Sequence, residues 1–294
     1  MSIELVKERY SGAINTVEIG RAGAAVKIGG ERTLPFLFKE GDMPNKPVVA
    51  LEIFDYDPQV KDPVAWAREC ADFGVRALAV RLQGIHPDSK NCSADEAVSV
   101  LKSIVKKVCL PLIVTGCGDI EKDNDVLPKV SQALKGENCL FGIATQNNYK
   151  TLAATCLADG HSIIAESPID VNIAKQLNIL ISDMGLDPGR IVMHPTTASL
   201  GYGMEYVYSI MERARLAAFI GDVMLAMPFV LFIGQEVWRT KEAREFGEAQ
   251  GVNWEITTAV SMLQAGADLL VMRNPEAART AMKYIDLAMK RGEE

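Results

Sequence analysis

Features that mark several other classes of protein are missing from this sequence of 294 residues. It has no run of eighteen apolar residues, and its first residues, MSIELVKERYSG, have neither the apolar core nor the cleavage site of a signal peptide. Basic residues are also scarce, since 31 Lys and Arg face 38 Asp and Glu and give a net charge of −7. Nucleic-acid surfaces need clustered basic residues. We therefore expect a cytoplasmic protein that binds neither membranes nor nucleic acid.

Metal-binding patterns are missing too. The six cysteines, at positions 70, 92, 109, 117, 139 and 156, contain no C-x-x-C pair, and the three histidines are isolated from one another. Structural zinc sites and iron–sulfur clusters need such closely spaced ligands. We therefore expect free thiols, no metal site and no iron–sulfur cluster in this chain.

What the sequence does contain is a regular alternation of short apolar runs with segments of helical periodicity. The eight runs are residues 48–53, 77–82, 111–115, 139–143, 162–165, 190–193, 228–233 and 267–272. Continuous apolar runs are typical of strands buried on both faces of a parallel sheet, where a crossover helix follows each strand. An open doubly wound sheet can also hold eight strands, but eight such units in this length favour a TIM (β/α)8 barrel, at residues 47–294.

The preceding segment, residues 1–46, has a different pattern. Residues 15–19 and 24–28 alternate polar and apolar side chains on either side of two glycines, which predicts a β-hairpin. We expect this hairpin to plug the N-terminal end of the barrel. The whole chain, 1–294, is then expected to form one domain.

In a TIM barrel, ligands bind at the mouth, the face formed by the loops that follow the strands. The candidate mouth positions lie at the ends of the eight apolar runs: Glu52, Asp55, Arg81, Gln83, 115–119, 145–148, 166–168, Asp170, 194–203, 234–235, Trp238 and 273–274. These positions are rich in Thr, Ser, Asn, Gln and Gly, and they contain neither a Ser-His-Asp set nor an evident acid–base pair. This composition favours a large ligand with a neutral polar edge over an anionic substrate, and predicts no catalytic residue in the chain.

Individual residues at these positions have ordinary structural explanations. Cys117 has no histidine partner that would activate it as a nucleophile, and Asp119 and Asp170 each precede a helix, as N-cap residues do. His194 is expected to be packed or hydrogen-bonded rather than bound to a metal. Trp238 is interpreted equally well as a ligand-stacking residue or as a side chain buried against the next helix.

Long segments of the chain resemble a known family. They are VTGCGDIEKD from Val114, QNNYKTL from Gln146, SPIDVNIAKQLNILI from Ser167, LGYGMEYVYSIMERARL from Leu200, WRTKEA from Trp238 and VMRNPEA from Val271. With these blocks in this order, the sequence closely resembles the small subunit of the corrinoid iron–sulfur protein, which in archaea is the delta subunit of the acetyl-CoA decarbonylase/synthase complex.

The resemblance implies a carrier of methyl groups in the reductive acetyl-CoA (Wood–Ljungdahl) pathway. The barrel would pair with a large subunit that carries an iron–sulfur cluster and a corrinoid-binding domain, and a cobamide would lie between that domain and the mouth. Its cobalt, cycling between Co(I) and methyl-Co(III), would receive the methyl group of methyl-tetrahydrofolate or methyl-tetrahydropterin through a methyltransferase and deliver it to acetyl-CoA synthase. The sequence agrees with this division between two subunits, since it lacks both a cysteine cluster and the D-x-H-x-x-G motif of His-ligated corrinoid binding.

The resemblance and the mouth positions together suggest cofactor-binding residues. They are Thr115, Gly116, Cys117, Asn148, Thr196, Gly201, Tyr202 and Gly203. The chain alone is expected to be colourless, because half of the site would belong to the large subunit. The loops at residues 54–67 and after Trp238 are shorter than in bacterial members of the family, which we expect to alter partner docking.

Two other functions fit the same pattern. In a pterin-dependent TIM-barrel methyltransferase that acts on its own, Asn147 or Asn148 would bind the pterin and Asp119 would fix its ring. In a pure docking scaffold, the mouth would be closed by protein and would contact no cofactor. Binding of a methyl-pterin by this chain alone would favour the methyltransferase.

Overall fold

Residues 9–34, 43–56 and 62–289 are described by a computed structural model. Strands and helices alternate as the sequence predicts, and the segments 1–8 and 35–42 of the predicted extension, and 57–61 of the first mouth loop, lie outside the described residues. The barrel strands are β3 (Val48–Phe54), β4 (Ala77–Arg81), β5 (Leu112–Thr115), β6 (Leu140–Ala144), β7 (Ser162–Glu166), β8 (Ile191–His194), β9 (Val230–Leu231) and β10 (Leu269–Met272).

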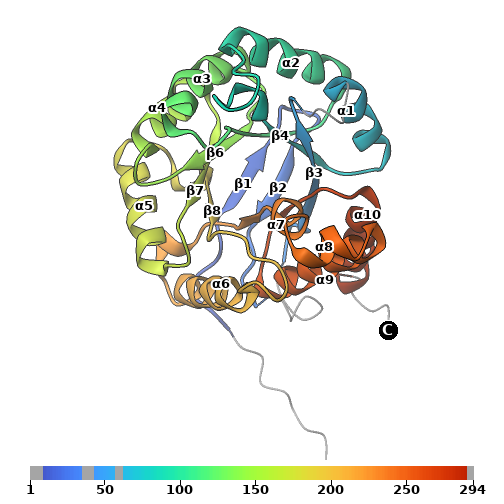
Figure 1. Ribbon diagram of the computed structural model, residues 1–294. Coiled ribbons are helices and arrows are strands. Elements are labelled where there is room, and N and C mark those ends of the chain that lie inside the picture. The colour runs from blue at the N-terminus through green and yellow to red at the C-terminus, as the bar shows by residue number, and fades with distance from the viewer. Residues whose placement is uncertain (1–8, 35–42, 57–61, 290–294) are drawn as a thin grey trace, which may run out of the picture.

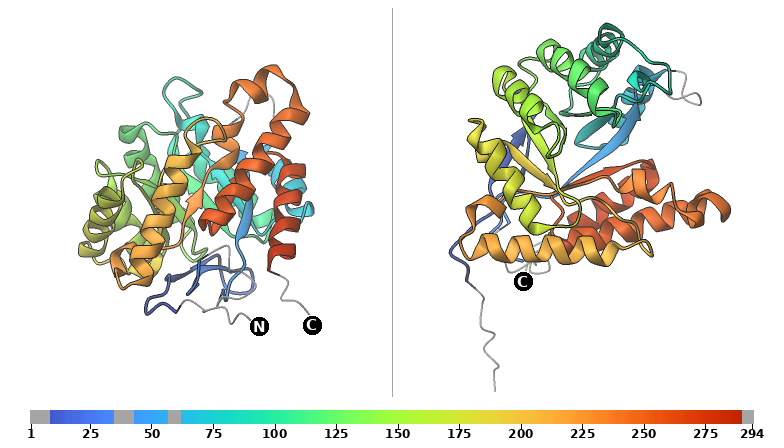
Figure 2. Two further views of the ribbon diagram at one scale, coloured as in Figure 1. Left: turned by 90° about the horizontal axis from the view of Figure 1, so that it is seen from below. Right: turned by 60° about the vertical axis from the view of Figure 1, so that its left-hand side comes forward.

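Helices surround these strands (Figures 1 and 2). They are α1 (Pro63–Asp72), α2 (Ala94–Lys107), α3 (Ile120–Ala133), α4 (Tyr149–Asp159), α5 (Val171–Asp183), α6 (Met204–Phe219), α7 (Ile233–Val237), α8 (Lys241–Glu245), α9 (Glu248–Ala265) and α10 (Pro275–Ala288), with 3-10 turns at Gln83–Ile85, Pro188–Arg190 and Val223–Leu225. In the parts of the chain that the structure describes, none of these helices has the length and apolar character needed to cross a membrane.

Side-chain caps fix where helices begin at the mouth. The Asp119 carboxylate accepts a hydrogen bond from the backbone N–H of Lys122 at 2.8 Å, and the Asp170 carboxylate accepts one from Asn172 at 2.7 Å. Each bond satisfies an amide that has no partner within its helix. Both N-cap predictions are confirmed.

The sheet is parallel, and its strands are ordered β8-β7-β6-β5-β4-β3-β10-β9. A parallel bridge between Met193 and Phe229 brings its two ends together, and the Met193 N–H donates to the Pro228 carbonyl at 2.8 Å. The barrel is thus nearly closed, and the predicted TIM-barrel fold is confirmed. All the strands point their carboxyl ends at one face, the mouth.

One strand is shorter than the sequence suggests. The apolar run 228–233 predicts a full strand, but β9 contains only Val230 and Leu231, and α7 begins at Ile233. An apolar run has the same appearance whether the chain is strand or buried helix, so periodicity does not mark this change. The early turn sets Gly234 so close to the backbone of Arg273 that a side chain there would collide with it.

The hairpin consists of β1 (Thr16–Ile19) and β2 (Val26–Gly29), paired antiparallel from Thr16 opposite Gly29. Its inward side chains form one apolar cluster with those inside the barrel; the hairpin contributes Val17, Ile19, Val26 and Ile28. Figure 2 shows the hairpin beneath the barrel, at the end opposite the mouth. The predicted hairpin is confirmed, and it closes the barrel floor.

A buried ionic group ties this floor together. Arg215 of α6, 1% exposed, donates to the Asp268 carboxylate at 2.7 Å and contacts the Glu31 carboxylate, which follows the hairpin. Asp268 also accepts the Phe229 backbone N–H at 2.7 Å. An ion pair removed from water stabilises a fold only while every charge keeps its partner.

Replacing Asp268 by Asn should therefore destabilise the protein by about 3–5 kcal/mol, because it leaves the buried Arg215 charge only partly compensated. Urea unfolding monitored by circular dichroism measures this loss. The matched control is Asp125→Asn, which breaks an exposed pair with Lys129 and should cost less than about 1 kcal/mol. Equal losses in the two variants would contradict the role of the buried group.

Candidate functional site

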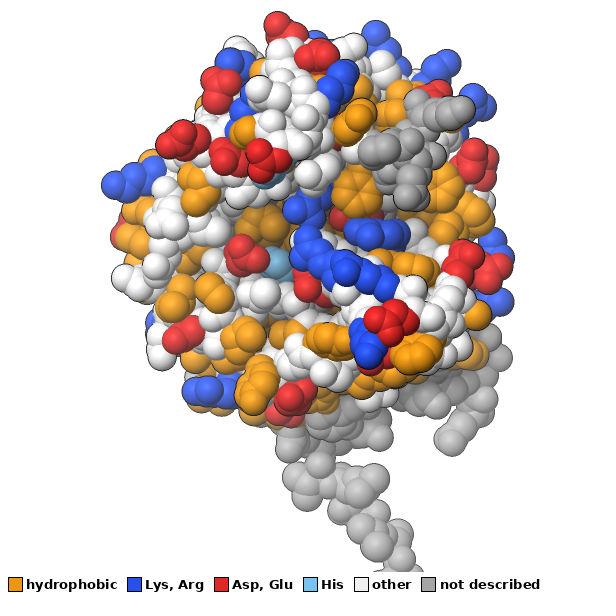
Figure 3. Space-filling view, in the orientation of Figure 1, with side chains coloured by type: hydrophobic (Ala, Val, Ile, Leu, Met, Phe, Trp, Pro, Cys, Tyr) orange, Lys and Arg blue, Asp and Glu red, His pale blue; other side chains and the backbone are white. Residues whose placement is uncertain are grey.

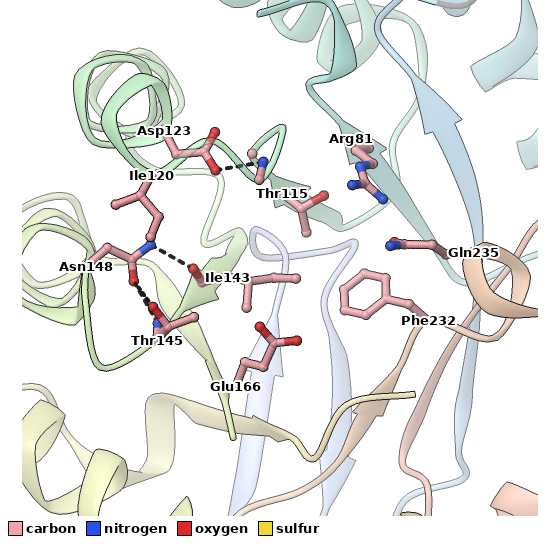
Figure 4. A pocket seen from close by; sticks show the side chains of 12 residues that line it. Arg81, Thr115, Ile120, Asp123, Ile143, Thr145, Asn148, Glu166, Phe232 and Gln235 are labelled. Atoms are coloured by element: carbon pink, nitrogen blue, oxygen red, sulfur yellow. Dashed lines mark hydrogen bonds between the residues drawn. The ribbon is translucent and has the colours of Figure 1, made fainter. Parts of the chain in front are cut away.

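A cavity of about 190 Å³ lies at the mouth. Its wall comes from strand ends, the loops that follow them and the first turns of α3 and α7: Arg81, Thr115, Gly116, Gly118, Ile120, Asp123, Ile143, Thr145, Asn148, Glu166, Phe232 and Gln235 (Figure 4). The mouth is thus the concave face that the barrel topology predicts.

The predicted cofactor-binding residues do not form one cluster. Thr115, Gly116 and Asn148 line the cavity, and Cys117 is buried beside it. The other four lie on the loop between β8 and α6: Thr196, Gly201, Tyr202 and Gly203. That loop forms part of the rim and contributes nothing to the cavity wall described here.

The loop after β5 is organised around the Asp123 carboxylate of α3. It accepts backbone hydrogen bonds from Cys117 at 2.8 Å and Gly118 at 3.0 Å, and the Cys117 thiol donates to it at 3.3 Å. A side chain at Gly116 would collide with this carboxyl group. Burial, with Asp123 nearby, raises the pKa of Cys117 to about 12, so its thiol stays protonated at neutral pH and is a poor nucleophile.

The loop after β6 uses Asn148 in the same way. Its Oδ1 accepts a hydrogen bond from the Thr145 backbone N–H at 2.7 Å, and its Nδ2 donates to the Ile143 carbonyl at 3.0 Å. The amide therefore holds the turn that forms this side of the cavity. Asn148 thus lines the cavity, but its Oδ1 and Nδ2 atoms are both hydrogen-bonded to the backbone of its own loop.

The loop after β8 packs its histidine inward. His194 is 4% exposed, with Nε2 3.1 Å from Thr197 Oγ1 and Nδ1 3.1 Å from the Glu166 carboxylate. Thr197 in turn accepts the Phe232 backbone N–H at 2.8 Å. The expected packed, hydrogen-bonded histidine is confirmed. The neighbouring Thr196 has a positive φ of 70° and a buried hydroxyl with no hydrogen-bond partner among the described residues.

At the rim, Tyr202 fastens this loop to the next unit. Its hydroxyl donates to the Glu242 carboxylate at 2.9 Å and accepts the Lys241 backbone N–H at 3.2 Å. The left-handed φ values of Gly201 and Gly203, 79° and 94°, turn the chain on either side. The tyrosine ring remains half exposed.

Glu255 of α9 supports the opposite side of the mouth. Its buried carboxylate accepts hydrogen bonds from the Trp238 indole at 2.7 Å, the Arg273 backbone at 2.6 Å and the Asn274 backbone at 3.2 Å. Trp238 is partly buried and also packs against the main hydrophobic core. Burial raises the pKa of Glu255 to about 7 despite these donors.

Stability should therefore depend on pH through Glu255. Its pKa is about 7 in the folded chain and near 4.5 when unfolded, so the folded state holds the proton more tightly and loses stability as pH rises towards 7. From pH 5 to 8 we expect a loss of about 2–3 kcal/mol that Glu255→Gln removes. Urea unfolding at a series of pH values tests this, with exposed Glu248→Gln as control. Parallel curves for wild type and Glu255→Gln would contradict it.

Exposed apolar side chains surround the mouth. Those on the loops and first helical turns of this face are Tyr56, Ile120, Ile169, Tyr202, Tyr206 and Phe246. Large apolar groups left in water at one face of a barrel are typical of a surface that another molecule covers.

Some residues of the site stand out only in the folded chain. Arg81 and Gln235 are among the candidate mouth positions, but most of those positions are neutral, so the sequence does not single these two out. Asp123 and Phe232 also line the cavity and are not among the candidate positions. The available signal was position, since Arg81 ends β4 and Arg273 directly follows β10. Across the residues described, no group of three or more His, Cys, Asp and Glu side chains is placed to hold a metal ion.

Fold and site together define a single-barrel α/β protein with a small mouth cavity inside an apolar rim. The model of the family described as CO dehydrogenase/acetyl-CoA synthase delta subunit matches residues 16–290. The chain belongs to this family, which confirms the resemblance seen in the sequence.

Individual relatives carry the same family name. The chain is 33% identical to the acetyl-CoA decarbonylase/synthase complex subunit delta of Methanocaldococcus jannaschii, over 93% of this chain and 73% of that protein. It is also 33% identical to the acetyl-CoA decarbonylase/synthase complex subunit delta 2 of Methanosarcina acetivorans, and that match covers 87% of this chain and 64% of the relative. The relatives are thus longer than the chain.

Among solved structures, dihydropteroate synthase of Xanthomonas albilineans with 4-aminobenzoic acid superposes with a TM-score of 0.63. The match covers 93% of this chain and 99% of the synthase, at 15% identity. The enzyme from Thermus thermophilus gives a TM-score of 0.60. At this identity, the likeness shows the fold alone.

Proposed function

We propose that this chain is a methyl-carrier subunit of the reductive acetyl-CoA (Wood–Ljungdahl) pathway. Together with a larger subunit it encloses a cobamide that accepts a methyl group from a methyl-tetrahydropterin or methyl-tetrahydrofolate and delivers it to acetyl-CoA synthase. Membership of the delta-subunit family supports this role. The cobamide supplies the methyl-carrying cobalt, and this chain supplies a wall around it.

The observation that carries the proposal is the size of the mouth cavity. At about 190 Å³ it is smaller than the roughly 300–1,000 Å³ that encloses a drug-sized ligand, and a corrin ring with its side chains is larger still. A ring can lie across this mouth but not within it. Its other face then needs a second protein surface, which is the arrangement of a shared site.

The groups in the cavity wall fit the edge of such a ring. Gln235 and Thr115 line the cavity, and their side chains make no hydrogen bond within the described part of the chain. An amide and a hydroxyl in this position can donate to and accept from the amide side chains of a corrin. His194 is buried against Thr197 and Glu166 and is absent from the residues that line the cavity, so it is not presented as a cobalt ligand.

The rim supplies the surface for the partner. Tyr206, in the first turn of α6, is 61% exposed, and Phe246, at the end of α8, is 65% exposed. Burying such side chains against another protein stabilises a complex by the hydrophobic effect, and aromatic residues are enriched at protein interfaces. We propose that the large corrinoid iron–sulfur subunit covers this rim, with methyltransferase and acetyl-CoA synthase reaching the cobamide in turn.

The alternative, a pterin-dependent methyltransferase acting on its own, is less well supported. The polar atoms of Asn148 and the Asp119 carboxylate, which would bind the pterin, are engaged in shaping their own loops. Asn147 remains exposed at the same turn. One group of this kind does not fix the orientation of a pterin.

The proposal is tested by producing the chain with its large subunit and recording the visible spectrum after adding cobamide. A corrinoid spectrum is expected for the purified pair and not for this chain alone. Tyr206→Ser should weaken the pair by about tenfold or more, because truncation of a buried interface aromatic commonly costs above 1 kcal/mol. Isothermal titration calorimetry between the two subunits measures that change.

The matched control is Ile220→Ser, at the far end of the same helix from Tyr206. Ile220 is 78% exposed and lies away from the mouth, so its loss should leave both pairing and spectrum unchanged. A full corrinoid spectrum from the large subunit alone, with no change on adding this chain, would refute the shared site. Methyl-pterin binding by the isolated chain would favour the methyltransferase instead.

A further inference from the structure

Arginines converge on one side of the mouth, against the acidic balance of the whole chain. Arg81 ends β4, Arg239 follows α7 and Arg273 follows β10. Figure 3 shows basic side chains gathered across the hollow at the centre of this face. Burial lowers the pKa of the Arg81 guanidinium, and the charges of Arg239 and Arg273 lower it further, against the opposing effect of Glu52. Arg239 and Arg273 therefore each lie close enough to Arg81 to repel its charge.

Two of these arginines have carboxylate partners. Arg273 donates to Glu52 through Nη2 at 2.7 Å and Nε at 3.1 Å, and it stacks over the Phe54 ring at 5.1 Å. Arg239 pairs with Glu236 at 3.0 Å. Their charges are balanced locally.

Arg81 is the exception. Within the described residues it forms no ion pair, and its buried Nε has no hydrogen-bond partner. Neither carboxylate of the cavity wall forms an ion pair with Arg81 among the described residues: Asp123 binds its own loop, and Glu166, which extends into the cavity (Figure 4), has one oxygen 3.1 Å from His194 Nδ1. A partly buried guanidinium without a partner is energetically costly. An anion in the cavity would remove that cost.

The surrounding groups indicate which anion fits. Figure 4 shows the Arg81 and Gln235 side chains extending toward one another across the cavity, and Thr115 belongs to the same wall. Hydrogen-bond donors thus come from β4, β5 and α7, in different directions. A tetrahedral oxyanion can accept from all of them, whereas a planar carboxylate matches chiefly the guanidinium fork.

We propose that Arg81, with Gln235 and Thr115, forms a subsite for the phosphate group of a small molecule. The subsite is a property of this chain and needs neither the cobamide nor the partner. Its occupant is recognised by a bidentate contact to Arg81 and by neutral hydrogen bonds on its other oxygens.

The test is calorimetric titration of the full chain, in low-salt buffer free of phosphate, with inorganic phosphate, glycerol 3-phosphate and succinate in separate experiments. Saturable binding of a phosphate, tighter than that of succinate, is expected. Arg81→Met should weaken it by about tenfold to a hundredfold, the range expected when a hydrogen bond to a charged group is lost. The exposed Arg213→Met is the control and should bind as wild type does.

The two phosphate probes separate the sources of the ligand. An ester that binds as well as inorganic phosphate would place the recognised group on a larger molecule, whereas binding of inorganic phosphate alone would indicate the free ion. Arg81→Lys, which keeps the charge but loses the planar fork, should bind more weakly than wild type, and it serves if Arg81→Met does not fold. Absence of saturable binding, tighter binding of succinate, or equal weakening in Arg213→Met would overturn the proposal.

Discussion

Closure of the parallel sheet is the constraint on which the rest of this molecule depends. The bridge between Met193 and Phe229 brings the ends of the sheet together, and every loop that follows a strand is then brought to the same face. The short β9 and the early start of α7 at Ile233 occur at this junction. They place Gln235 over the cavity instead of on a strand. The short β9 and the early start of α7 thus contribute both to the closure of the barrel and to the cavity wall.

Below the mouth, the barrel is filled, and its floor is held by charge as well as by packing. The hairpin inserts Val17 and Ile28 into the apolar cluster inside the strands, and Arg215 links the segment after the hairpin to the start of β10 through Glu31 and Asp268. Side chains of the described residues thus fill the barrel interior, and the cavity lies at the mouth, where loops of adjacent units meet.

The sequence was sufficient to predict the barrel, the hairpin and the N-caps at Asp119 and Asp170, because each depends on local periodicity or on a side chain two or three residues from its partner. The site was harder to predict. Asn148 and Cys117 were candidates because polar and reactive groups follow strands, yet their contacts serve Thr145 and Asp123 nearby. A sequence position shows that a side chain is at the mouth but does not reveal whether its polar atoms remain free.

The same reasoning explains why charge was underestimated. Arg81, Arg239 and Arg273 are far apart in the sequence, and composition averages them against many acids elsewhere in the chain. Only the folded barrel brings them together and shows that Glu52 and Glu236 neutralise two of them. The charges that line a cavity, and not the net charge of the chain, decide which ligand the cavity favours. The mouth thus combines exposed apolar side chains at its rim with Arg81, which has no ion-pair partner among the described residues, and the proposed partner surface and anion subsite rest on these two separate features.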